Sequence, residues 1–501
     1  MNRYSFAKGV TLQAGQEGSS LIVDYPRRIL KLNAAGAEAV KQACGIAPWG
    51  ETWNTKSLSF ILHLENQGIL TRNFPRLAES KLPFVSIVVP TYNRAEMLGL
   101  CLQSLLNLDY PSDKLEIIVV DDFSPLPVDV DLPSAQVIRL ERNSGPGEAR
   151  NTAVRSAKGE VIAFLDDDCL AGGQWLKNLV PCFQFPDVAA AGGKVEPAAL
   201  DRALERYEEV QSPLSMGDES RKVRRGSAVS YLPTCNLLVR RKSLLEVDGF
   251  DPAMRVGEDV DLCWRLLEQG GNIYYLPSGK VFHHHRARLI PFLRRRHNYG
   301  QSEAVLQARF PVEKRRLYFF PGHISIVGIT VLVTLLAGVL PGLATGAALI
   351  VLNQLFQSGR KFFQAKKAGC NPGFSQVFRL IFKSQATAAY VYSQHFSRYY
   401  SIFATGLTLL LFPPAAAVLA LVHGLSGIVD YRLKKPALGS GSFILYHCLE
   451  DAAYQTGVLR GCLAEHNWRP LRMDFIRADG TLPPAPRHQK KAIWSFGFFD
   501  K

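Results

Sequence analysis

VIAFLDDDC, residues 161–169, joins five apolar residues to three consecutive aspartates. Adjacent carboxylates repel one another unless a cation lies between them. On an extended segment, alternation would point Asp166 and Asp168 to one side and Asp167 to the other. Carboxylate oxygens suit Mg²⁺ or Mn²⁺, and Mg²⁺ commonly joins protein carboxylates to substrate phosphates. The stretch therefore predicts a strand that ends at a cation and diphosphate site; a solvated acidic loop is the alternative.

Strands and helices alternate around this stretch, from residue 82 to about residue 285. Short runs of β-branched residues predict the strands, and amphipathic segments between them predict the helices. This is the pattern of an α/β protein with an open, mostly parallel sheet, in which ligands bind at the carboxyl ends of the strands. The predicted strands are 84–90, 115–120, 135–139 and 160–165, and the predicted helices are 95–106 and 146–156.

Polar motifs follow each of the four strands. PTYNR occupies residues 90–94, VVDDFSP delivers Asp122, and NSGPGEAR lets the backbone approach a ligand at Gly145 before Arg150 on the next helix. Each motif alone is ordinary turn chemistry, but all four at one sheet edge predict a common ligand site. The candidate ligand-binding residues are Pro90, Tyr92, Arg94, Asp122, Gly145, Arg150, Asp166 and Asp167.

Two later motifs add candidate acid–base and metal groups. GEDVDLCWRLLEQGG places Glu258 and Asp259 at the start of an amphipathic helix, where they either complement the helix dipole or supply a general base for an attacking hydroxyl. KVFHHHR follows a short strand, and alternation sends His283 and His285 to one side. Either histidine could join Asp168 in the metal shell; a surface cluster is the alternative reading.

Residues 10–75 predict a small module resembling a winged helix. Strands at 20–23 and 28–32 flank a turn at 24–27, and a helix at 34–44, a second helix at 58–66 and a closing strand follow. Winged helices commonly bind DNA, but the second helix region, LSFILHLENQ, has no Lys or Arg to meet phosphates. DNA binding is therefore disfavoured.

The composition is that of a large folded protein with a basic excess. The 501 residues are 47% hydrophobic and carry a net charge of +14. Nine cysteines occur singly, without a C-x-x-C pair, which predicts a reduced, cytosolic setting. The N-terminus has no apolar core of a signal peptide, so we expect no cleaved leader.

Two long uncharged stretches predict membrane-associated helices. Residues 324–356 and 400–429 contain 33 and 30 residues without a charge, and one span needs about 20. Pro341 with Gly342, and Pro413 with Pro414, interrupt them, so each predicts a helical hairpin or a re-entrant pair; buried soluble helices are the alternative.

The charge beside these stretches indicates their orientation. Residues 286–316 contain nine Lys or Arg against two Glu, and residues 357–399 contain seven and no acid. Basic flanks favour the cytoplasmic side, so an even number of crossings, or none, lies between them. Attraction to an anionic membrane also accounts for the positive charge without a nucleic-acid partner.

The ordered set VSIVVPTYNR, VVDDFS, NSGPGEARN, FLDDD and GEDVDLCWR resembles glycosyltransferase family 2, the inverting GT-A nucleotide-sugar transferases, over residues 84–300. The resemblance implies the GT-A fold, with a Rossmann-like mixed sheet. It further implies that residues 90–94 and Asp122 hold the uridine of a UDP-sugar and that Arg150 lies by the nucleotide. Asp166 and Asp168 would face the sugar and the metal-bridged diphosphate. Asp259 would be the base, and His283 best matches the metal-ligating histidine.

The order of the domains along the whole chain resembles one particular group within this family. LNAAGAEAV followed by ILHLENQGIL is similar to peptide-recognition domains of the PQQ-chaperone type, and this module, a family 2 domain and an apolar C-terminal part resemble the glycosyltransferases of mycofactocin systems. That group implies an enzyme on the cytoplasmic face of a bacterial inner membrane. It would add β-1,4-linked glucose from UDP-glucose to a peptide-derived redox cofactor, and residues 10–75 would recognise the acceptor or its precursor peptide.

The same resemblance predicts the domain boundaries, and one missing motif argues against processive synthesis. The expected domains are 1–80, a peptide-recognition domain; 81–300, the transferase; and 301–501, a membrane-associated helical region with a cytoplasmic C-terminal segment. Processive members of the family carry a Q-x-x-R-W segment, whereas this chain reads RRRHNYGQSEAV there, so long processive synthesis is not expected.

Three alternatives stay open. A membrane glycosyltransferase acting on a lipid-linked or cell-wall glycan, of the rhamnosyl or galactofuranosyl type, would share every catalytic motif and differ in its acceptor. A non-catalytic binding protein would not need the intact set of Asp166, Asp168, Asp259 and Arg150. A nucleotidyltransferase also uses metal-binding carboxylates, but the motif order and the acidic pair at a helix start fit sugar transfer better.

Overall fold

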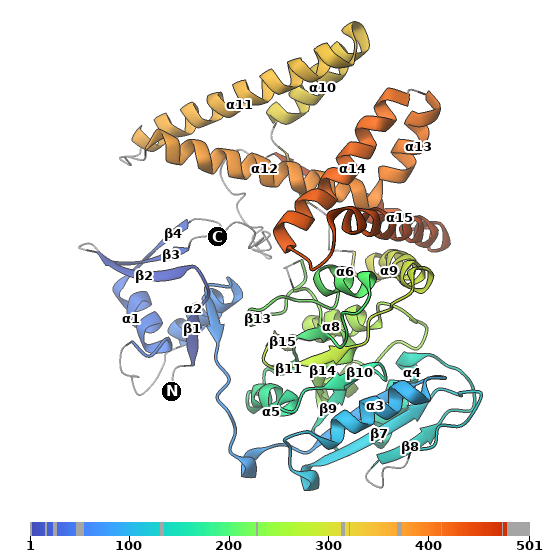
Figure 1. Ribbon diagram of the computed structural model, residues 1–501. Helices are drawn as coiled ribbons and strands as arrows, with labels where there is room; N and C mark the ends of the chain where they lie inside the picture. The colour runs from blue at the N-terminus through green and yellow to red at the C-terminus, as the bar shows by residue number, and fades with distance from the viewer. Residues whose placement is uncertain are drawn as a thin grey trace. The chain divides into compact units, whose positions relative to one another are not determined.

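The computed structural model describes residues 3–15, 18–23, 28–46, 55–130, 135–226, 229–311, 316–319, 321–367, 373–411, 413–472 and 474–477. Two compact units are distinguished (Figure 1): the first runs from Met1 to Leu289, and the second begins at Ile290. Each is described by itself. The domain limits at residues 80 and 300 stay predictions.

The N-terminal module contains a three-stranded antiparallel sheet in the order β2-β3-β4, two helices and a strand pair β1-β5. The Asn33 side chain caps α1, accepting a hydrogen bond from the Gly36 amide at 2.8 Å. Sequence reasoning missed β1 and β2, and the predicted turn at 24–27 lies outside the described residues. The elements are β1 (Tyr4–Phe6), β2 (Val10–Gly15), β3 (Gly18–Val23), β4 (Arg28–Leu32), α1 (Ala34–Ala43), α2 (Thr55–Asn66) and β5 (Leu70–Arg72).

An eight-stranded mixed sheet forms the centre of the first unit, in the order β13-β15-β11-β14-β9-β6-β7-β8. The predicted parallel core is present, since β6 pairs in parallel with β7 and β9, and β7 with β8. Antiparallel β14 lies between β9 and β11 and makes the sheet mixed. The strands are β6 (Val85–Thr91), β7 (Leu115–Asp121), β8 (Ala135–Arg139), β9 (Val161–Phe164), β11 (Val188–Gly192), β13 (Arg221–Lys222), β14 (Leu237–Arg240) and β15 (Asn272–Tyr275).

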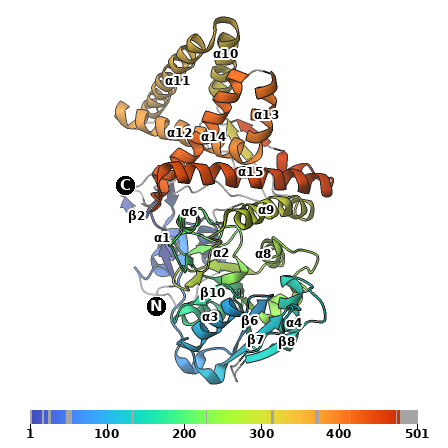
Figure 2. The same ribbon diagram turned by 45° about the vertical axis from the view of Figure 1, so that its right-hand side comes forward.

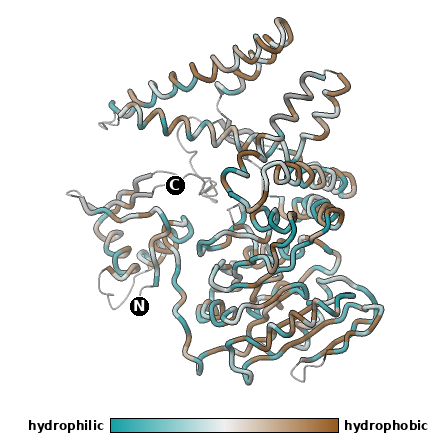
Figure 3. Tube along the Cα trace, viewed as in Figure 1, coloured by the Kyte–Doolittle hydropathy of each residue, from teal (hydrophilic) through white to brown (hydrophobic). Residues whose placement is uncertain are grey.

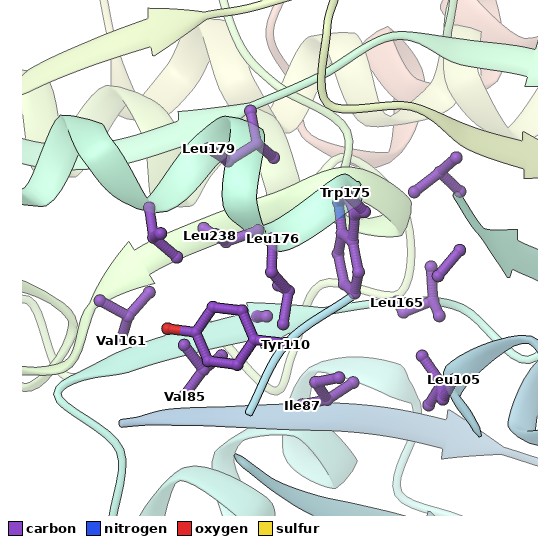
Figure 4. Close-up of a cluster of buried hydrophobic side chains, with 14 of the residues drawn as sticks. Val85, Ile87, Leu105, Tyr110, Val161, Leu165, Trp175, Leu176, Leu179 and Leu238 are labelled. Atoms are coloured by element: carbon purple, nitrogen blue, oxygen red, sulfur yellow. The ribbon is translucent and has the colours of Figure 1, made fainter. Parts of the chain in front are cut away.

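Helices cover both faces of this sheet, which explains why its central strands are apolar throughout. On one face, Ile87 of β6 and Leu105 of α3 pack with Trp175 of α5 (Figure 4). On the other face, Val88 packs in a core that includes Ala153 of α4. The helices of this unit are α3 (Ala95–Leu106), α4 (Pro146–Ser156), α5 (Trp175–Leu179), α6 (Ala203–Gln211), α7 (Arg241–Glu246) and α8 (Glu258–Glu268).

A second, three-stranded sheet lies beside the ends of the central strands. It contains β10 (Cys169–Ala171), β16 (Val281–His283) and β12 (Val195–Pro197), with β16 in the middle. The antiparallel register pairs Cys169 with His283. This pairing brings the segment after the aspartates next to the histidine motif, although the two are far apart in sequence.

A buried ionic network attaches the N-terminal module to the central sheet. Arg72 Nη1 lies 2.9 Å from Asp187 Oδ2, and Arg72 Nε lies 3.2 Å from Glu65 Oε1. Tyr274 of β15 donates its hydroxyl proton to the same Glu65 oxygen at 2.7 Å. Because Glu65 and Arg72 are both buried, the network ties α2 and β5 to the part of the sheet formed by β15 and β11.

The second unit consists mainly of helices. A short parallel pair joins β17 (Arg316–Phe319) to β18 (Asp474–Arg477). The helices are α9 (Leu289–Arg309), α10 (Pro321–Ala337), α11 (Val339–Lys367), α12 (Phe374–Tyr399), α13 (Ser401–Leu411), α14 (Pro413–Lys434) and α15 (Ser440–Ala464).

The two uncharged stretches form two helical hairpins, α10–α11 and α13–α14, whose arms pack along each other (Figures 1 and 2). The predicted position of the first break was wrong. The chain turns at Gly338, whose φ is +95°, and Pro341 lies in the first turn of α11, where proline needs no amide partner. Within the described residues, one segment, Val339–Gln364, is long and apolar enough to cross a membrane, and 17% of its most apolar window is buried.

Candidate active site

The three consecutive aspartates lie in a turn rather than on a strand. Strand β9 ends at Phe164, and the Cys169 amide donates to the Asp166 carbonyl at 3.0 Å. The predicted alternation is therefore wrong, because a turn does not impose the period of two that a strand has. Asp166 faces Arg150, whereas Asp167 and Asp168 share the side chain of Arg94.

Arg94 provides the cation beside two of the aspartates. Its Nη1 lies 3.1 Å from Asp167 Oδ1 and 2.7 Å from Asp168 Oδ2, and its side chain is 43% exposed. Burial raises the pKa of Asp167 to about 6, although Arg94 opposes this shift. Burial also acts to raise the pKa of Asp168, but the positive charges of His283, Arg94 and Arg286 leave it below its usual range. Asp168 is thus held as a carboxylate.

The predicted metal ligands are brought together. His283 Nε2 lies 3.5 Å from Asp168 Oδ1, and Asp168, Cys169 and His283 form the one group of metal-ligand side chains recognised among the described residues. His285 contacts His283 and Glu208. Its Nδ1 lies 3.1 Å from His283 Nδ1 and 3.8 Å from a carboxylate oxygen of Glu208.

The donor set fits a divalent cation such as Mg²⁺ or Mn²⁺, since it offers a carboxylate oxygen from Asp168 and an imidazole nitrogen from His283. Sequence reasoning did not select Cys169, and its position next to Asp168 was the signal that could have found it. Burial raises the pKa of the Cys169 thiol well above its usual value, so the protonated sulfur is a poor ligand.

Arg150 connects Asp166 to the start of α8. Its guanidinium is 3% exposed, with Nη2 2.7 Å from Asp166 Oδ1 and Nη1 3.0 Å from Glu258 Oε1. It also lies over the ring of Phe250, with Cζ 5.4 Å from the ring centroid. Two carboxylates therefore bind the two terminal nitrogens of this guanidinium. Its expected place beside the nucleotide stays a prediction, and so does a catalytic role for Glu258, whose carboxylate is part of this buried link.

The predicted base, Asp259, follows Glu258 on the first turn of α8 and is half-buried. Its Oδ1 accepts a hydrogen bond from the Val260 amide at 2.8 Å. The pKa of the buried Cys235 thiol depends on the charges around it. A hydrogen bond with Cys169 lowers this pKa. Burial and the negative charges of Asp166, Asp168 and Asp259 have the larger effect and leave the pKa raised. The negative charges of the predicted base and of the predicted metal carboxylate therefore both act on the pKa of this thiol.

Asp122 binds the backbone of the loop that contains Ser144 and Gly145. Its Oδ1 accepts from the Ser144 amide at 2.7 Å, and its Oδ2 accepts from the Gly145 amide at 2.8 Å. Gly145 has a φ of +91°, which favours glycine, and it precedes the first residue of α4. Both carboxylate oxygens of Asp122 are thus bound to the protein backbone. Whether Asp122 also holds a uridine stays a prediction.

Exposed aromatic rings follow two adjacent strands. Pro90 is buried within β6, opposite Val120, whereas Tyr92 follows the strand and is 47% exposed. Phe123, which sequence reasoning missed, follows β7 and is 46% exposed. Aromatic faces at such strand ends can stack on a nucleobase. Arg139, also missed, lies over the Phe123 ring at 5.2 Å and pairs with the buried Asp121.

Comparisons with known proteins agree with this fold and motif set. Residues 86–247 match the family described as glycosyl transferase family 2. The pre-mycofactocin glycosyltransferase of Mycobacterium tuberculosis is 29% identical over 404 residues, covering 77% of this chain and 81% of that protein. Glycosyltransferase AglE of Haloferax volcanii is 28% identical over 251 residues, covering 48% of this chain and 79% of its own.

A solved structure also aligns with the chain. It is the mannosyltransferase PcManGT from Pyrobaculum calidifontis in complex with GDP-Man and Mn²⁺, which is 20% identical over 72% of this chain and 93% of its own, with a TM-score of 0.37. The sequence matches, rather than this low score, relate residues 86–247 to glycosyl transferase family 2 and the chain to the pre-mycofactocin enzymes.

Proposed function

Given that this chain is a glycosyltransferase with a family 2 domain at residues 86–247, we propose that it transfers a hexose from a UDP-sugar with inversion at the anomeric carbon. The observation that carries this proposal is the pairing of Asp168, in the turn that follows strand β9, with His283. A bound Mg²⁺ or Mn²⁺ would supply a Lewis acid that stabilises the departing diphosphate.

Asp168 and His283 would hold that cation, and the Arg94 guanidinium beside Asp168 would contact the negatively charged diphosphate. Tyr92 and Phe123 would flank the uracil ring at the ends of β6 and β7. Arg150 would keep Asp166 and α8 in place, since it is buried between Asp166 and Glu258. These contacts position the donor before the acceptor arrives.

Asp259 would act as the general base. Its carboxylate takes the proton from the acceptor hydroxyl, and the hydroxyl oxygen then forms the new bond to the anomeric carbon. The bond from that carbon to the diphosphate oxygen breaks at the same time, and UDP leaves with the electron pair. Attack opposite the leaving group inverts the anomeric configuration without a covalent intermediate on the protein.

For the acceptor we propose a peptide-derived redox cofactor of the mycofactocin type, with glucose as the donated sugar and β-1,4 linkage. Similarity to a pre-mycofactocin glycosyltransferase along 81% of that protein supports this choice, because the match extends beyond the family 2 domain. The N-terminal module would recognise the acceptor or its precursor peptide. The enzyme would act at the cytoplasmic face of a bacterial inner membrane, held there by the apolar hairpins.

A lipid-linked or cell-wall glycan is the second candidate acceptor. The exposed leucines of the hairpins favour it, because a bilayer-bound enzyme meets a lipid-linked substrate directly. The catalytic steps would be the same for either acceptor. The two proposals differ in the molecule that enters beside Asp259.

The experiment that tests the function uses the purified full chain with Mn²⁺, a panel of UDP- and GDP-sugars, and either the aglycone of the redox cofactor or a polyprenyl-linked glycan. We expect UDP-glucose to glucosylate the aglycone, with an inverted anomeric centre in the product by NMR. Transfer to the lipid-linked glycan alone would favour the second candidate. Absence of transfer from every sugar nucleotide to either acceptor would contradict both.

A further inference from the structure

We infer that both helical hairpins of the second unit enter an anionic bilayer from one side and end inside its hydrocarbon core. This inference rests on the proposed membrane association. It adds that the hairpins enter the bilayer without crossing it. The short helix α13 of the second hairpin, the chemistry of the two tips and the polar base from which the hairpins rise carry it.

The second hairpin is too short to span. Helix α13 has 11 residues, which at 1.5 Å per residue extend about 16 Å, whereas the hydrocarbon core is about 30 Å thick. Its partner helix α14 also has polar residues at a similar distance from the tip. They are Ser426 and Asp430, which are buried against neighbouring helices. This hairpin therefore reaches about the middle of a bilayer.

The first hairpin has a tip suited to hydrocarbon. The Gly338 amide donates to the Thr334 carbonyl at 3.0 Å, and the Gly342 amide donates to the Gly338 carbonyl at 3.2 Å, so the turn keeps these backbone donors satisfied. Leu336 and Leu340 beside it are 79% and 80% exposed. A tip in the far aqueous phase would normally carry polar or charged residues. Here residues 324–356 contain no charge.

The tips of both hairpins point toward the same end of the unit, and α12 and α15 lie at the opposite end in both views (Figures 1 and 2). Leu410 and Leu411 at the second tip are 84% and 75% exposed. Figure 3 shows apolar residues gathered along both hairpins toward their tips. Two uncharged tips at the same end of the unit indicate insertion from a single side.

The base of the hairpins carries the charges. The buried Asp451 of α15 lies 3.8 Å from Arg398 of α12 and 3.6 Å from His447, an ionic cluster that needs a polar environment or internal pairing. In α12, Phe382 is 58% exposed and the next residue, Lys383, is also exposed. This mixture of apolar and cationic side chains is typical of a helix that lies at an anionic lipid surface.

A shallow cleft on α11 provides a second contact for lipid. Its lining includes Leu355, Phe356 and Phe363, next to the guanidinium of Arg360. An acyl chain fits the apolar lining, and a phosphate headgroup fits the arginine. The partner surface is therefore an anionic phospholipid bilayer, with basic residues at the headgroups and leucine tips in the hydrocarbon.

The mode of insertion is tested with Leu336→Cys and Leu410→Cys, each added as full-length protein to preformed phosphatidylethanolamine and phosphatidylglycerol vesicles. A membrane-impermeant maleimide is supplied either outside or inside the vesicles, and mass spectrometry identifies the labelled peptide. We expect no tip labelling from either side and full labelling in detergent. Labelling from the lumen would show a complete crossing, and labelling from outside would show an exposed tip; either result overturns the inference.

Binding itself is tested separately by vesicle flotation. Leu410→Asp should weaken binding at least about tenfold, because an aspartate in hydrocarbon is strongly disfavoured. Leu106→Asp is the matched control, since Leu106 of α3 is 62% exposed but lies in the catalytic unit; it should bind as the wild type does. Absence of binding by the wild type would overturn both this inference and the proposed membrane association, whereas lumenal labelling of a bound protein overturns the inference alone. Sugar transfer, measured with a soluble acceptor in detergent, reports on the glycosyltransferase proposal independently.

Discussion

Arg94 Nη1 lies 2.7 Å from Oδ2 of Asp168, while Oδ1 of the same carboxylate lies 3.5 Å from His283 Nε2. One carboxylate is thus shared between an internal cation and the histidine that we propose as a metal ligand. Because different oxygens are involved, a divalent cation can bind beside Arg94 without displacing it. Arg94 would then repel a lone metal ion and attract a metal that arrives with a diphosphate.

The first prediction concerns this charge. Arg94→Gln should bind Mn²⁺ alone more tightly, roughly three- to tenfold, because one positive charge leaves a half-exposed site. It should bind UDP in the presence of Mn²⁺ more weakly, because the diphosphate loses a partner. Electron paramagnetic resonance measures the first affinity, and calorimetry measures the second.

Arg155→Gln is the control for net charge, since Arg155 lies on the surface of α4 and pairs with Glu148. It should change neither affinity. A simple loss of structure in Arg94→Gln would weaken both bindings together, so weaker binding of Mn²⁺ alone would count against the assigned role.

The second prediction decides which histidine ligates the metal. His283→Ala should reduce Mn²⁺ affinity by about 10- to 100-fold, the range seen when groups that support a metal site are removed. His285→Ala should have a smaller effect, because His285 contacts His283 and Glu208, whereas His283 contacts Asp168. Titration of each variant with Mn²⁺ compares them. An equal or larger loss in His285→Ala would reverse the assignment.

The third prediction concerns the buried arginine. Arg150→Gln should lower the free energy of unfolding of the first unit by about 3–5 kcal/mol, because it leaves Asp166 and Glu258 without their buried cation. Denaturant unfolding followed by circular dichroism measures the change. The exposed Arg155→Gln should cost at most about 1 kcal/mol. Equal stabilities of the two variants would show that the buried pairings contribute nothing.

The fourth prediction concerns the attachment of the N-terminal module. Arg72→Leu should release the module from the sheet, because Glu65 and Asp187 lose their shared partner. We expect faster proteolysis in residues 73–82 than in the wild type. Lys8→Leu is the control, since Lys8 is exposed and its pairing with Glu219 is long, at 3.7 Å. An unchanged rate for Arg72→Leu would mean that other contacts hold the module.

Local patterns predicted the catalytic fold well. Helices at 95–106 and 146–156 were predicted with the bounds that the structure has. Their amphipathic faces, and Pro146 at the start of the second, are signals contained in the segments themselves. The mixed sheet was also expected, but its antiparallel strand β14 was not, because that pairing depends on long-range order.

The site was less predictable because its contacts are tertiary. Alternation gave the wrong directions for the three aspartates, since nothing local shows that the strand ends at Phe164. Arg94 was chosen for the nucleotide, yet its partners here are Asp167 and Asp168. The meeting of Cys169 with His283 requires the register of β10 on β16, which sequence spacing does not reveal.

The most direct test of the account compares transfer with binding in Asp259→Asn. Nucleotide and Mn²⁺ affinities should stay near wild type, because Asp259 is not among the residues assigned to the donor. The rate of sugar transfer should fall by about 10²- to 10⁴-fold, the range expected when a general base is removed. Single-turnover transfer from a labelled UDP-sugar, measured at saturating donor on the same preparation, gives this rate. Transfer at the wild-type rate would remove Asp259 as the base and contradict the proposed mechanism.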